Sequence, residues 1–323
     1  MPINTIETRQ VFQKELDKQM MEGLTSSFMD TNAGRVIYNG GSEIKIPKMS
    51  LTGLKDYSRG DGYPSGSITL EYETRTMKMD RGTSFQIDAM DVDESNFVAT
   101  AGNVLGEFQR TKVIPEVDAY RYSTVQDLAK ENAVIAAVTE ANVYKLLIKD
   151  ISAVQDIVGE STPLVCCMSG TAKGFLNAST EFSKNIEVTE FKRGEITTKV
   201  RVVNGVPILS VPSDRMYHQY IFKKGNLENL AESGFEKAEG AEMADWIILP
   251  VAAAIAVCKQ DKGKIIDPDT NQKADAWFIG YRKYHDVWVK DSRIKAILPH
   301  YGKEPSWGSV DENQEEGKGG GTP

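Results

Sequence analysis

The sequence has few of the residues that build covalent or metal frameworks. Its 323 residues include only three cysteines and three histidines. Cys166 and Cys167 are adjacent in an apolar segment that favours a strand, where neighbouring side chains point to opposite faces. The histidines are isolated from one another and lack the spacing of zinc ligands. We therefore expect neither a disulfide framework nor a metal site, and free thiols suit a reducing cytosol.

Long apolar runs are also missing. The longest, residues 246–258, has 13 residues, whereas a membrane-spanning helix needs roughly 20. Residues 1–13 mix charges with scattered apolar side chains and lack the apolar core of a signal peptide. We expect no transmembrane segment and no export by that route.

Basic residues are fewer than acidic ones. The chain has 38 Lys and Arg against 46 Asp and Glu, for a net charge of -8. Proteins that grip nucleic acid normally cluster Lys and Arg against the phosphates. This balance argues against a protein that grips nucleic acid, so that any DNA nearby would not be bound in a sequence-specific way.

No catalytic or phosphate-binding motif is complete. The segment from Gly170 to Gly174 lacks the spacing of a phosphate-binding loop, and Ser169 lacks the preceding glycine of a nucleophile elbow. The segments that start at Asp91 and Asp267 imitate a calcium loop but lack its Gly and its final Glu. We assign no catalytic, cofactor-binding or metal-binding residue and expect a non-enzymatic protein, with an enzyme carrying an unrecognised site as an alternative.

An amphipathic helix is predicted over residues 93–120. Apolar residues recur at three- and four-residue spacing, and acidic residues lie near its start. Pro115 interrupts the pattern, so we expect a bend there. The predicted core-facing residues of this helix are Phe97, Ala101, Leu105 and Phe108.

Residues 44–90, before this helix, favour an extended β ribbon rich in glycine and charge. Ile68, Leu70 and Tyr72 alternate with polar residues, and Phe85 resumes the pattern after a break. The ribbon has too few apolar residues for a core of its own, and two-stranded hairpins are only marginally stable in water. We expect it to pack on its own domain or on a neighbouring molecule, and we predict inter-subunit contacts at these four residues.

The remaining chain interleaves strand and helix signals, which indicates an α+β fold. Asn204 and Gly205 form a dipeptide that favours a tight hairpin turn. The predicted strands are residues 163–168, 197–203, 206–211, 247–249, 265–266, 276–284 and 287–289, and the predicted helices are residues 125–147, 151–158, 170–177 and 251–257.

Taken in order, these elements resemble the major capsid proteins of tailed bacteriophages, with the Hong Kong 97-like fold that encapsulins share. Residues 108–121, FQRTKVIPEVDAYR, are similar to the end of the spine helix in coat proteins. Residues 203–213, VNGVPILSVPS, resemble an axial-domain strand pair, and residues 265–286 resemble the late strands of the peripheral domain.

The resemblance implies five regions. They are an N-terminal arm over residues 1–43, an E-loop over residues 44–90, a peripheral domain with the spine helix over residues 91–130 and 258–303, an axial domain over residues 131–257, and a disordered tail over residues 304–323.

The resemblance also implies a structural role. Copies would form the pentamers and hexamers of an icosahedral shell around the double-stranded DNA of a tailed phage or prophage, located in the virion and assembled in the host cytoplasm. The partners are other copies of the chain, with a separate scaffolding protein, a portal and decoration proteins as further candidates, and no cofactor. An encapsulin-like compartment, which holds an enzyme in place of a genome, is the alternative with the same fold.

Overall fold

The computed structural model of the protein describes residues 23–35, 37–38, 43–60, 62–88, 90, 101–180, 187–193, 196–226 and 229–307. In chain order the helices and strands are η1 (Ser27–Arg35), β1 (Ile37–Tyr38), β2 (Glu43–Leu51), β3 (Ile68–Thr76), β4 (Met79–Asp88), α3 (Ala101–Phe108), η2 (Gln109–Val113), α4 (Ile114–Leu128), η3 (Lys130–Asn132), β5 (Val134–Ile135), α5 (Val143–Val158), β6 (Leu164–Ser169), α6 (Gly170–Ala178), β7 (Glu187–Arg193), β8 (Ile196–Val203), β9 (Val206–Val211), η4 (Ser213–Arg215), β10 (Tyr220–Asn226), β11 (Asn229–Lys237), β12 (Ala244–Pro250), β13 (Ala254–Ile266), η5 (Pro268–Thr270), β14 (Ala276–Val289), α8 (Asp291–Ile294) and β15 (Leu298–Tyr301).

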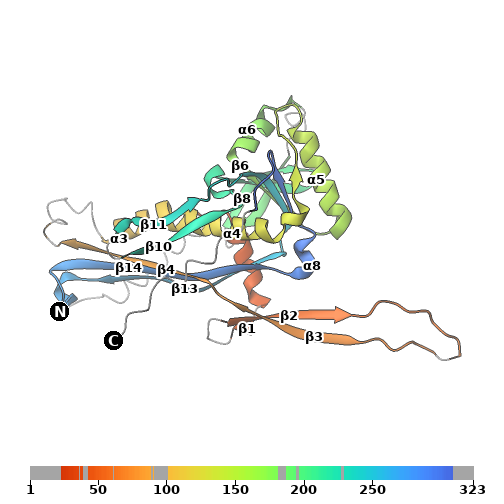
Figure 1. The fold of residues 1–323 in the computed structure, drawn as a ribbon, viewed down its shortest axis with the longest axis horizontal. Coiled ribbons are helices and arrows are strands. Elements are labelled where there is room, and N and C mark those ends of the chain that lie inside the picture. Colours follow the sequence, from red (N-terminus) through yellow and green to blue (C-terminus); the bar gives the residue numbers. More distant parts are fainter. Residues whose placement is uncertain are drawn as a thin grey trace, which may run out of the picture.

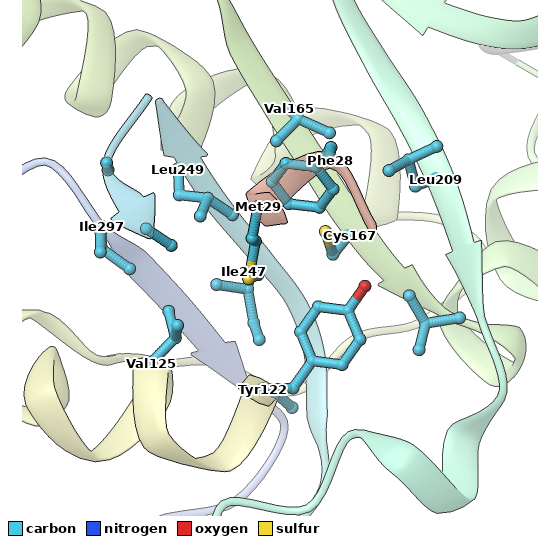
Figure 2. Packing of buried hydrophobic residues seen from close by; sticks show 14 of the residues in the cluster. Phe28, Met29, Tyr122, Val125, Val165, Cys167, Leu209, Ile247, Leu249 and Ile297 are labelled. Atoms are coloured by element: carbon cyan, nitrogen blue, oxygen red, sulfur yellow. The ribbon is translucent and has the colours of Figure 1, made fainter. Parts of the chain in front are cut away.

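A seven-stranded sheet forms the centre of the α/β part of the molecule, in the order β5-β15-β12-β6-β9-β8-β7. One face packs under α5 and α6, and the other packs against α4 and η1. Cys166 lies in the cluster under α5, whereas Cys167 lies on the opposite face beside Phe28 and Tyr122 (Figure 2). The prediction that the two cysteines point to opposite faces is therefore confirmed.

A long helical run lies between the two β layers (Figure 1). It consists of α3, the π-helical turn η2 and α4. The wide turn comes just before Pro115, which cannot donate a hydrogen bond to the carbonyl of Thr111 as a regular helix requires. The predicted irregularity at Pro115 is thus a π turn. The predicted helix over residues 125–147 is wrong, because α4 ends at Leu128 and α5 begins only at Val143.

A three-stranded sheet, in the order β13-β14-β4, lies along this helical run. Leu105 and Val117 of the helices pack against Ile279 and Tyr281 of β14. β14 is one continuous strand rather than the two that we predicted.

The segment predicted as a helix over residues 251–257 is mainly strand, because β13 begins at Ala254. Ala254 and Ala256 pack into the buried cluster on the α4 face of the large sheet. Core packing therefore outweighs the helical preference of this alanine-rich segment.

A hairpin of β2 and β3 projects from the body (Figure 1). Its strands end at Leu51 and Thr76, whereas β4 pairs with β14 in the other sheet. The segment predicted as one E-loop, residues 44–90, therefore joins two different structures, and the described hairpin spans residues 43–76.

Other predicted boundaries also shift. β15 pairs with β12, so residues 298–301 belong to the seven-stranded sheet and not to the layer of β13 and β14. The hairpin of β10 and β11 was not predicted. At the start of the predicted tail, Trp307 packs 4.6 Å from the ring of His218, and residues 308–323 lie outside the described part.

Candidate inter-subunit interface

The β2-β3 hairpin presents an apolar face to solvent. Its register pairs Met49 with Leu70 and Leu51 with Ile68, and paired residues on antiparallel strands share a face. Tyr72 follows on the same face, two residues after Leu70. These five side chains keep 50–73% of their surface exposed. Burial stabilises a large apolar side chain by roughly 1.5–3 kcal/mol, so this face is unfavourable to leave in water.

The opposite face of the hairpin is buried at its base. Ile44 and Ile46 are out of phase with Met49 along β2, so they point the other way. They pack with Met77 and Trp288 in a small buried cluster. The hairpin is thus attached to its own subunit by one face and leaves the other face open.

The connection between the strands, residues 52–67, adds three exposed apolar side chains: Leu54, Tyr57 and Tyr63. The two tyrosine rings meet edge to face, with their centroids 5.2 Å apart. Ser58 and Gly62 form an antiparallel bridge, and Gly62 has a φ of +80°, which glycine adopts without strain. The tip therefore has a defined turn that displays aromatic rings.

Charged side chains follow the other face of β3. Arg75 Nη2 lies 2.5 Å from Glu73 Oε1 and 3.7 Å from Asp291 Oδ1 at the start of α8. Partly exposed pairs of this kind contribute little stability. They place charge on the face opposite the apolar one. The two faces of the hairpin would therefore bind partner surfaces of different chemistry.

Three of the four predicted contact residues lie on this hairpin. Ile68, Leu70 and Tyr72 are exposed on its apolar face. Phe85 is placed differently: it lies in β4, with its ring centroid 5.1 Å from that of Phe108. The alternation that suggested Phe85 is real, but the strand belongs to the sheet under the helical run, so its ring has a partner within its own chain.

The predicted helix residues fall in two groups. Leu105 is buried and Phe108 half-buried in the cluster between the helical run and β14. Ala101 is the first residue of α3, and Phe97 lies outside the described residues.

Sequence reasoning missed Met49 and Leu51, which complete the apolar face. Their alternation is only two residues long, and it follows Pro47, which looks like the end of a strand. Met49 and Leu51 are identified by their pairing with Leu70 and Ile68. This register depends on both strands and cannot be read from either segment alone.

The described residues contain no group of three or more His, Cys, Asp or Glu placed to hold a metal ion. Burial raises the pKa of the Cys167 thiol to about 12 and that of Cys166 well above its ordinary value, so both stay protonated and unreactive. None of the helices in this part of the chain combines the length and apolarity needed to cross a bilayer.

Comparisons with known proteins give matches among solved structures. No protein-family model and no curated protein matches the sequence. The capsid structure of cyanophage P-SCSP1u superposes with a TM-score of 0.56 at 13% identity, over 83% of this chain and 85% of that chain. The mature capsid of bacteriophage PhiM1 gives 0.53 at 13% identity, over 82% and 83% of the two chains. The chain has the phage capsid fold.

The phage capsid fold agrees with the α+β architecture that the sequence predicted. Both of these solved structures are phage capsids.

Proposed function

We propose that this chain is a major capsid protein of a tailed phage or prophage. In this role it is a structural subunit that assembles, as pentamers and hexamers, into an icosahedral shell around double-stranded DNA. It needs no catalytic residue and no cofactor. The shell is located in the virion and assembles in the host cytoplasm, with a separate scaffolding protein, a portal and decoration proteins as further candidate partners.

The open face of the hairpin carries this proposal. Met49, Leu51, Ile68, Leu70 and Tyr72 stay exposed although the opposite face of the same two strands is anchored to the subunit. A second copy of the chain is the partner that this surface fits, because a closed symmetric assembly repeats one contact between identical subunits. Stable protein interfaces bury at least about 1,200 Å², and a projecting hairpin reaches far enough to contribute to one.

The direct test compares two substitutions on neighbouring residues of β3. Leu70→Glu places a charge on the apolar face, whereas Thr69→Glu places the same charge on the opposite face one residue away. Both positions are exposed, so neither substitution disturbs the core of the subunit. Size-exclusion chromatography, mass photometry and negative-stain electron microscopy then report assembly.

We expect the wild type and Thr69→Glu to form closed shells and Leu70→Glu to remain as unassembled subunits, because a buried unpaired charge is strongly unfavourable. Shells of normal yield from Leu70→Glu would contradict the role of the hairpin face. A wild type that stays monomeric, even when it is co-expressed with candidate scaffolding proteins, would contradict the proposed function.

The contents of shells purified from a phage-producing host distinguish the two uses of the fold. A genome-length DNA supports the capsid. A single enriched enzyme, found by mass spectrometry in shells that lack DNA, would instead favour the compartment alternative.

A further inference from the structure

The hairpin leaves the body at Met77 and Lys78, the two residues between β3 and β4. The carbonyl of Met77 accepts a hydrogen bond from the hydroxyl of Tyr284, at 3.1 Å. The backbone N–H of Lys78 donates to Oδ2 of Asp286, at 2.8 Å. Both backbone groups at this corner are therefore held by side chains of β14.

Asp286 links this corner to the helical run. Its Oδ1 accepts hydrogen bonds from the hydroxyl of Tyr120 in α4 and from the N–H of Val287, each at 2.7 Å. The side chain is 3% exposed, and it meets three donors in all. One buried carboxylate thus joins α4, β14 and the exit of the hairpin.

The other strand of the hairpin reaches the same stretch of β14. Ile44 and Ile46 of β2 pack with Met77 and with Trp288. Together with the hydrogen bonds above, three alternate residues of β14 hold the base of the hairpin. We call Tyr284, Asp286 and Trp288 the root clamp.

Because the hairpin is long, a small rotation at its base moves its far end by a large distance. Each strand has 9 residues. At about 3.3 Å per residue the strands reach about 30 Å, so a rotation of about 10° at the root would move their far end by about 5 Å. A shift of that size exceeds what a closely packed interface tolerates. The short strand β1 pairs with β2 only near the base, at Lys45 and Ile44. Beyond it the hairpin is a two-stranded ribbon, which is only marginally stable alone and cannot set its own direction.

We infer that Asp286, together with Tyr284, is a positioning residue that fixes the direction in which the hairpin leaves the subunit and thereby the geometry of assembly. The inference rests on the proposed function for its effect on shells. Its effect on the direction of the hairpin concerns the subunit alone and can be measured without assembly.

Asp286→Asn removes one hydrogen bond of the clamp and can keep the other two. The single carbonyl oxygen of the asparagine can still accept from Tyr120 and Val287, but its NH₂ group then faces the N–H of Lys78, and two donors cannot form a hydrogen bond. Asp286→Asn combined with Tyr284→Phe therefore removes both hydrogen bonds at the exit and leaves the apolar packing of Trp288 in place.

A matched control removes the same chemical groups beside the clamp but outside its hydrogen bonds. Asp80→Asn combined with Tyr281→Phe takes away one carboxylate and one hydroxyl, which bond to Arg282 and Asp261. Tyr284→Phe alone is the milder variant, to be used if the double variant unfolds.

The measurement is the distance between two spin labels in the unassembled full-length subunit. Labels at Thr69→Cys on the hairpin and Ser152→Cys on α5 occupy exposed positions, and Cys258→Ser removes the exposed native thiol. Pulsed electron paramagnetic resonance then gives the distribution of distances. Electron microscopy of the unlabelled variants gives the diameter and shape of the particles.

We expect a single narrow distance peak for the wild type and the control, and loss of that peak in Asp286→Asn/Tyr284→Phe, with a shift to misshapen particles or to none. An unchanged peak together with normal shells in the double variant would overturn the root clamp. A wild type that forms no shells but shows the narrow peak, lost in the double variant, would refute the proposed function and leave the clamp supported.

Discussion

His300 lies fully buried between two hydrogen-bond acceptors. Its Nδ1 is 2.6 Å from Oδ2 of Asp150, and its Nε2 is 3.0 Å from the carbonyl oxygen of Ala136. The indole of Trp246 stacks on the imidazole at 4.0 Å and donates its N–H to the same carboxylate oxygen. Both neighbours of the imidazole are hydrogen-bond acceptors, so the ring links the carboxylate of Asp150 to the backbone of Ala136. The pair ties α5 to β15 and β12.

Asp150→Asn should lower the free energy of unfolding by about 1–3 kcal/mol, because an amide replaces the buried carboxylate that Trp246 and His300 both contact. Urea unfolding of unassembled subunits measures the loss. Asp156→Asn, at an exposed position on the same helix, is the matched control and should stay within about 0.5 kcal/mol of wild type. A loss below about 0.5 kcal/mol for Asp150→Asn, within the range of the control, would contradict a structural role for this contact.

The sequence could not identify the partners of His300. Asp150 and His300 are 150 positions apart, and neither belongs to a local motif. Contacts of this kind follow from the order of strands in the large sheet, which periodicity along one segment does not encode.

The segment from Leu24 to Met29 is buried in the core of its own subunit, although the sequence suggested that residues 1–43 form an arm. Phe28 and Met29 are fully buried on the α4 face of the large sheet (Figure 2). Asp118 of α4 accepts hydrogen bonds from the backbone and side chains of Thr25 and Ser26. Residues 1–22 of the predicted arm lie outside the described residues.

Phe28→Ala should cost about 3–5 kcal/mol of unfolding free energy, the usual range for emptying the site of a buried phenylalanine. Thermal or urea unfolding of the full chain measures this cost. The control is Gly34→Ala in the same η1 element, where an added Cβ would meet nothing within 4 Å. If Phe28→Ala were as stable as this control, η1 would not be part of the core.

Elements with strong local chemistry were predictable, and those set by packing were not. Asn204 and Gly205 have φ angles of 48° and 76° and join β8 to β9 by the tight turn that the dipeptide predicts. The opposite case is the end of β14, where His285 and Asp286 looked like a break between two strands. Both are buried, and Tyr120 and the root of the hairpin surround them, so the strand continues.

At the scale of the whole molecule, the order of elements was the informative signal. A ribbon, a long helix and an α/β region follow one another as predicted, and the structure has the phage capsid fold. The sequence did not indicate where the projecting hairpin ends and the body of the subunit begins. β3 and β4 have similar alternation, and they differ in the strand with which each pairs.

The charge of the whole chain predicts how an assembled shell treats DNA. With a net charge of -8 per subunit, a shell should repel the phosphates at close range, since screening acts over about 10 Å at 0.1 M salt. Empty shells mixed with linear double-stranded DNA and passed over a sizing column should release the DNA at physiological salt. Co-elution of shells and DNA under these conditions would contradict the prediction, and a shell with added surface lysines serves as the positive control.

β14 supplies side chains to three separate buried clusters along its 14 residues, and alternate positions near its end hold the hairpin. Inserting or deleting one residue in the middle of this strand would move every following side chain to the opposite face. The sheet would then lose its packing against the helices, the hairpin or both. The codons for residues 52–67 have no such coupling, because the connection that they encode touches little of the body. Evolution of this gene can therefore change the length of the hairpin tip while the length of β14 stays fixed.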